Sequence, residues 1–117
     1  ILKKFVNNPY PFLKLSDVFV LSSNYEGLPN VLLEAQFFKK IIISTKCPTG
    51  PKEILLNGKA GIFFKMNDHK DLSKKINYVY KNKNKLKNIT KIGYANLNRF
   101  NEIKNLNLYY NVISKYL

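Results

Sequence analysis

The stretch Glu26-Gly27-Leu28-Pro29-Asn30-Val31-Leu32-Leu33-Glu34 places two carboxylates around the expected start of a helix. Residues 17–21 (DVFVL) come just before it and are apolar, β-branched and aromatic, which predicts a short buried strand. Gly27 permits a sharp reversal of the chain, and Pro29 suits the first helical position, where its missing N–H is not needed. We therefore predict a strand, a tight turn carrying Glu26, and a helix with Glu34 about a turn and a half along it.

This order of elements points to a ligand site at the end of a sheet. In open α/β sheets, ligands bind at the carboxyl ends of the strands, and the free N–H groups and dipole of a helix start favour a phosphate. Two carboxylates beside such a phosphate site suit the hydroxyl groups of a sugar or a ribose. The alternative for Glu26 is a turn carboxylate that the helix dipole merely stabilises.

The spacing of Glu26 and Glu34, with Gly-Leu-Pro-Asn inside it, resembles the E-x7-E signature of retaining GT-B glycosyltransferases of family 4 (glycosyl transferases group 1). Residues 8–23, which include NPYPFL and SDVFVLSS, are similar to the family's run before the motif. Residues 45–55 (TKCPTGPKEIL) are similar to its later C-P-S-G-P-[RK]-E-I-L segment. The resemblance covers residues 1 to about 80 in order and in spacing.

The resemblance implies a role for each residue of the motif. In this family the first glutamate contacts the donor sugar, the second contacts the ribose of the nucleotide, and backbone N–H groups between them hold the diphosphate. Glu26 would therefore be the catalytic-region residue. The donor-binding residues would be Gly27, Leu28, Pro29, Asn30, Val31 and Glu34. The resemblance implies no cofactor and no metal, with a nucleotide diphosphate sugar as substrate, and the one histidine and one cysteine offer no metal cluster.

The chain departs from the family pattern after the second glutamate. The family has small residues, then glycine and proline, where residues 36–41 read QFFKKI, and it has proline where this chain has Lys65. Loss of the glycine removes the usual left-handed helix stop, although Lys39 and Lys40 suit the negative end of a helix dipole.

The resemblance also defines the expected domain: residues 1–117 would be a partial C-terminal nucleotide-sugar-binding domain, with the N-terminal lobe absent. That lobe, which a separate chain could supply, would hold the glycan or lipid-linked acceptor and much of the catalytic surroundings. The chain alone should therefore transfer no sugar. The competing hypothesis is a non-catalytic remnant or interaction module that keeps the fold.

The predicted fold class is α/β: a Rossmann-like parallel sheet with flanking helices, the C-terminal lobe of GT-B, and a helical C-terminus. Residues 17–21, 29–39 and 41–44 form a β-α-β unit, which favours parallel strands. Asp68 is the expected N-cap of a later helix, with Asp71 completing a capping box. The remaining expected elements are strands at 3–6 and 60–64, a turn at 57–58, and helices at 10–15, 52–56, 84–98 and 102–116.

The net charge of +13 is confined to one part of the chain, because residues 1–38 hold three lysines and three carboxylates and so sum to zero. A basic patch in residues 39–117 could contact an anionic membrane surface or nucleic acid. A single arginine and no pattern of stacking aromatics disfavour nucleic acid. The plainest alternative is compositional, because Lys, Asn and Ile (19, 16 and 11 residues) share A/T-rich codons.

Three features of the sequence bear on the cellular location of the protein. No apolar run approaches the ~20 residues of a membrane span, and the start of the chain lacks the layout of a signal peptide. One cysteine cannot form an internal disulfide, which fits a reducing compartment. We expect a cytoplasmic protein, located peripherally at the inner face of the membrane if the basic part contacts lipid.

Overall fold

The structure is a computed structural model that describes residues 5–115. Its centre is a three-stranded parallel sheet in the order β1-β2-β3, formed by β1 (Val18–Leu21), β2 (Ile41–Thr45) and β3 (Ile62–Phe64). Val20 pairs with Ile43, and Ile43 pairs with Ile62 on its other side. The predicted α/β class and the parallel pairing are confirmed.

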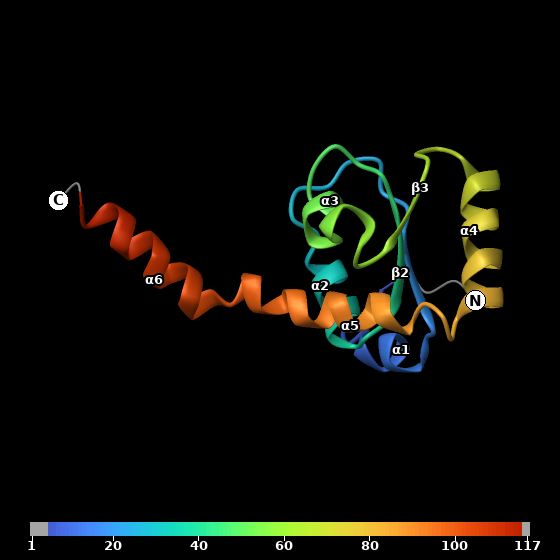
Figure 1. The fold of residues 1–117 in the computed structure, drawn as a ribbon, viewed down its shortest axis with the longest axis horizontal. Helices are drawn as coiled ribbons and strands as arrows, with labels where there is room; N and C mark the ends of the chain where they lie inside the picture. Colours follow the sequence, from blue (N-terminus) through green and yellow to red (C-terminus); the bar gives the residue numbers. More distant parts are fainter. Residues whose placement is uncertain (1–4, 116–117) are drawn as a thin grey trace.

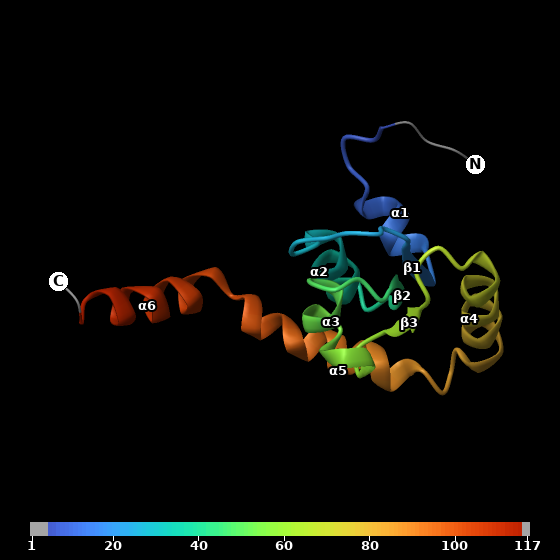
Figure 2. The same ribbon diagram turned by 90° about the horizontal axis from the view of Figure 1, so that it is seen from above.

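Within residues 5–115, eight helical segments surround or extend the sheet. They are α1 (Tyr10–Leu15), α2 (Asn30–Phe37), α3 (Pro51–Ile54), the 3₁₀ turn η1 (Leu56–Gly58), α4 (His69–Asn82), α5 (Lys87–Asn96), the 3₁₀ turn η2 (Leu97–Phe100) and α6 (Glu102–Ile113). Figure 2 shows α4 on one face of the sheet and α2, α3 and α5 on the other. Figure 1 shows α6 projecting away from this body, which accounts for the long dimension of 54 Å against 29 and 28 Å.

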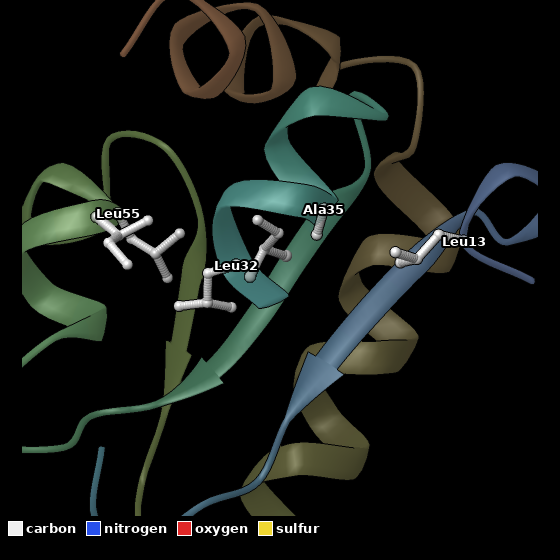
Figure 3. Packing of buried hydrophobic residues seen from close by; sticks show 6 residues of the cluster. Leu13, Leu32, Ala35 and Leu55 are labelled. Carbon is white, nitrogen blue, oxygen red and sulfur yellow. The ribbon is translucent and has the colours of Figure 1, made fainter. Parts of the chain in front are cut away.

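The strand β2 is buried on both faces because helices cover both. Alternate side chains of a strand point to opposite faces, so β2 contributes side chains to two separate hydrophobic clusters, one on each face of the sheet. Ile42 packs with Leu32 and Ala35 of α2, with Leu13 and with Leu55, as Figure 3 shows for the labelled residues. On the other face, Ile41, Ile43 and Phe64 of the strands pack with Val79 of α4 and with Leu86, the residue before α5.

The helix α2 is shorter than the predicted 29–39. Pro29 is its N-cap, with an extended ψ of 98°, rather than its first helical residue, so that prediction was wrong by one position. At the other end Lys39 adopts the left-handed conformation (φ 53°) that glycine usually provides. The N–H of Lys40 donates to the carbonyl of Ala35 and that of Lys39 to Gln36, both at 2.9 Å, so the helix stops as a glycine cap would stop it.

The bounds of several other elements also differ from the predicted ones. The predicted strand at residues 3–6 is absent at Phe5 and Val6, and its first two residues lie outside the described residues. The predicted helix 84–98 begins at Lys87 and tightens into η2, and α6 ends at Ile113. Asn57 and Gly58 form the predicted turn, both at positive φ.

Candidate functional site

Two loops meet at the carboxyl edge of the sheet and are joined by hydrogen bonds. One follows β1 (residues 22–29) and carries Glu26, and the other follows β2 (residues 46–50). The hydroxyl of Thr45 and the thiol of Cys47 both donate to the carbonyl of Ser23, the thiol at 3.0 Å. The hydroxyl of Thr49 donates to the carbonyl of Glu26 at 2.6 Å. The backbone that carries Glu26 is therefore held in place from the neighbouring strand.

Gly50 brings the two loops into direct contact. Its φ of 68° is left-handed, and a Cβ added there would overlap the carbonyl oxygen of Gly27 and lie 2.8 Å from Cδ of Pro29. Gly27 was expected to make the sharp reversal, but its φ is not left-handed, and a Cβ added to it would meet nothing within 4 Å. Gly50 is thus the glycine that the geometry requires, and Gly27 borders open space.

The start of α2 points its free N–H groups at this edge. The N-cap residue Pro29 makes no side-chain cap, and the first turn closes with the N–H of Leu32 donating to the carbonyl of Pro29 at 2.9 Å. The first N–H groups of a helix have no intrahelical partner, so those of Asn30 and Val31 remain available to an acceptor. Together with the helix dipole they make a site suited to a phosphate or another anion. Leu28 lies beside them and is exposed.

The two glutamates of the motif lie in different surroundings. Glu26 is half-buried on the fastened loop. Glu34, also half-buried, lines a cavity of about 530 Å³ whose other walls are mostly aromatic: Tyr10, Leu33, Phe37, Phe38, Leu97 and Phe100. Glu26 precedes α2 and does not line that cavity, whereas Glu34 lies past the middle of α2, so the structure does not bring the two glutamates into one pocket.

The chemistry of the Glu34 cavity combines one carboxylate with ring surfaces. The rings of Tyr10 and Phe38 lie 5.8 Å apart, and Phe37 meets Phe38 edge to face at 5.4 Å. A carboxylate accepts hydrogen bonds from hydroxyl groups, while aromatic faces favour a flat or apolar group. Helical spacing alone placed Glu34 beside Phe37 and Phe38, but Tyr10 and Phe100 come from distant elements and could not be found that way.

Sequence reasoning also missed how the loop after β2 supports the site. Thr45, Cys47, Thr49 and Gly50 all contact the loop that carries Glu26, although the only local signal was a glycine between threonine and proline. Within residues 5–115, no three His, Cys, Asp or Glu side chains cluster in a way that could hold a metal ion. In the same part of the chain, no helix has the length and apolar character needed to span a bilayer.

In α/β domains, a helix start at the carboxyl edge of a parallel sheet is a common place for phosphorylated ligands to bind. The family model described as glycosyl transferases group 1 matches residues 1–96. The chain therefore belongs to the group 1 glycosyltransferase family.

Curated relatives agree with this family over shorter stretches. An uncharacterized glycosyltransferase of Methanocaldococcus jannaschii is 56% identical over 48 residues, which are 41% of this chain and 12% of the relative. A capsular polysaccharide biosynthesis glycosyltransferase of Staphylococcus aureus is 34% identical over 76 residues, 65% of this chain and 20% of the relative. The chain thus spans about 12–20% of the length of these two relatives.

A solved structure shares the fold. The crystal structure of HepE from Anabaena in complex with UDP superimposes with a TM-score of 0.79 at 20% identity, covering 89% of this chain and 29% of that one. This likeness confirms the α/β architecture expected for a lobe of a GT-B glycosyltransferase.

Proposed function

We propose that this chain is the donor-binding half of a retaining family 4 glycosyltransferase, with Glu26 and Glu34 as its E-x7-E motif. The whole enzyme would move a sugar from a nucleotide diphosphate sugar to a glycan or lipid-linked acceptor, with retention at the anomeric carbon. A further lobe, in the same or a separate chain, would bring the acceptor. The single cysteine, buried at Cys47, fits a reducing cytoplasm.

The proposal rests on one observation. The start of α2, which has no side-chain cap at Pro29, lies beside two loops that are hydrogen-bonded and packed against each other. The N–H groups of Asn30 and Val31 would receive the diphosphate, next to the open space at Gly27. The UDP in the HepE complex and the polysaccharide role in the name of the S. aureus relative support a nucleotide sugar as the donor.

In the proposed mechanism, the N–H groups at the start of α2 provide the main electrostatic stabilisation of the leaving group. Negative charge grows on the leaving diphosphate as the glycosidic bond to the donor breaks. N–H groups that are already aligned stabilise that charge without reorganisation, which is the usual source of such rate enhancement. Glu26, on its fixed loop, would orient the sugar, and Glu34 would accept hydrogen bonds from the ribose hydroxyls.

Substitution of each glutamate by glutamine separates the two roles. In an enzyme reconstituted with the remaining lobe, Glu26→Gln should lower kcat by roughly ten- to a thousandfold, since about 1.4 kcal/mol of lost transition-state contact is tenfold. Glu34→Gln should mainly raise KM and weaken nucleotide binding, because its contact is made in both ground and transition states. Steady-state kinetics and nucleotide titration measure both effects.

Thermal melting of both variants provides the folding control. Glutamine keeps the size and polarity of glutamate, and both side chains are only half-buried, so neither change should unfold the chain. A folded Glu26→Gln enzyme with near-full turnover would show that Glu26 only shapes the loop.

A further inference from the structure

We propose that the outward face of α4 is a docking surface for an anionic phospholipid bilayer. This goes beyond the proposed sugar transfer and does not depend on it. The inward face of α4 packs Leu72 and Val79 against the sheet. Figures 1 and 2 show α4 as the outermost layer of the body, at the end opposite α6. Its other face is therefore open to a partner.

Three exposed lysines form a column on that face. Lys70, Lys74 and Lys81 lie at relative positions 0, 4 and 11 of the helix. At about 100° per residue these positions fall within roughly 40° of one another around the helix axis. None of the three forms an ion pair with a residue in the described range 5–115.

The only carboxylate in α4 lies beside this column and is already engaged. Asp71 accepts a hydrogen bond from the N–H of Lys65 at 2.8 Å, and its other oxygen lies 4.0 Å from Nζ of Lys75. It is half-buried, whereas the column is exposed. The face that α4 presents is therefore uniformly positive, which is complementary to an anionic headgroup layer.

Two exposed tyrosines border the lysine column on opposite sides. Tyr80 is 85% exposed and Tyr78 is 50% exposed. Tyrosine is favoured at the membrane interface, where its ring meets the acyl boundary and its hydroxyl meets water. Lysines that reach anionic headgroups and tyrosines at the interface together suit a surface that lies against a bilayer without inserting into it.

The observations favour a bilayer over nucleic acid. The surface is a convex helix face and not a groove, and its cations are lysines, which are compact point charges. The single arginine of the chain, Arg99, lies elsewhere, 3.7 Å from the carboxylate of Glu53. Lys85, in the connection that follows α4, is a further exposed lysine.

Vesicle sedimentation with the purified 117-residue chain tests the proposal. The chain should bind vesicles of phosphatidylglycerol and phosphatidylcholine but not of phosphatidylcholine alone, and high salt should release it. The triple variant Lys70→Gln/Lys74→Gln/Lys81→Gln should bind about a hundredfold more weakly, at about fivefold for each lysine near the surface. Tyr80→Ser should weaken binding severalfold while leaving the charge unchanged.

The matched control removes the same charge from other elements. Lys52→Gln/Lys59→Gln/Lys104→Gln changes lysines on α3, after η1 and on α6, and should retain binding within about fivefold. Melting curves of both triple variants confirm that they are folded.

Three results would overturn the proposal. The first is equal weakening by the two triple variants, which would mean that net charge alone drives binding. The second is no binding to the anionic vesicles at low salt. The third is tighter binding of a single-stranded RNA oligonucleotide than of vesicles in the same buffer, which would assign the surface to nucleic acid.

Discussion

Gly50 is the residue on which the geometry of the candidate site depends most directly. It has a left-handed φ of 68° and lies against the carbonyl of Gly27 and the ring of Pro29. Gly50→Ala should destabilise the fold by about 2–4 kcal/mol, because it adds backbone strain and an overlap with main-chain atoms that cannot move aside cheaply. Urea or thermal unfolding measures the change.

Gly27→Ala is the matched control for this prediction. Its new Cβ meets no atom within 4 Å, and its φ is not left-handed, so stability should stay within about 1 kcal/mol of the parent. Wild-type melting of Gly50→Ala would mean that the two loops are not packed as described.

The helix stop at Lys39 shows what a residue pattern could not predict. The absence of glycine suggested that the helix had lost its left-handed stop. Lys39 nevertheless adopts the left-handed backbone conformation, which typically costs a non-glycine residue about 1–2 kcal/mol. Its Nζ lies 4.6 Å from the ring centre of Tyr94, a cation–π contact that offsets part of that cost. Tyr94 lies on α5, so the compensating contact becomes visible only in the folded chain.

Among the elements, α4 begins at the predicted N-cap, Asp68, but the predicted capping box with Asp71 does not form. The carboxylate of Asp68 accepts the N–H of Asp71 at 2.9 Å, while the carboxylate of Asp71 bonds Lys65 instead of completing a capping box. The backbone hydrogen bond from Asp71 holds the pKa of Asp68 below its usual 3.8, with burial opposing it and Lys65 assisting.

The lowered pKa of Asp68 predicts a pH-dependent cap. Because the folded pKa lies below the unfolded one, the stabilisation is full above about pH 4 and is lost as pH falls through the folded pKa. Asp68→Ala should therefore lower the melting temperature by about 3–6 °C near neutral pH, with a smaller difference at about pH 2.5. Asp68→Asn keeps a cap without the charge, so near neutral pH it should melt between the parent and Asp68→Ala. A constant Asp68→Ala deficit at all pH values would contradict this account.

Local patterns predicted most elements but not how the site is supported. The β-α-β unit followed from apolar runs at 17–21 and 41–44, and the neighbours of Glu34 on its own helix followed from helical spacing. The bond from Thr49 to Glu26 spans 23 residues and depends on how two loops pack. Periodicity also predicted α6 without showing that it projects from the body, with Ile103 72% and Tyr110 71% exposed.

On the scale of the whole molecule, the candidate site is an open edge. The proposed donor contacts are the start of α2, the loop with Glu26 and the cavity at Glu34, and no further lobe encloses them within residues 5–115. We expect the chain to bind a nucleoside diphosphate with Kd on the order of a millimolar, about −4 kcal/mol.

An NMR titration of the isotope-labelled chain with UDP tests the central claim, that the start of α2 binds the donor diphosphate. The amide signals of Gly27, Leu28, Asn30 and Val31 should shift together with a single millimolar Kd, and Glu34→Gln should weaken that binding while leaving the melting temperature unchanged. Shifts confined to the lysine face of α4, or no shift near Gly27–Val31 in a folded chain at ten times the expected Kd, would contradict the account.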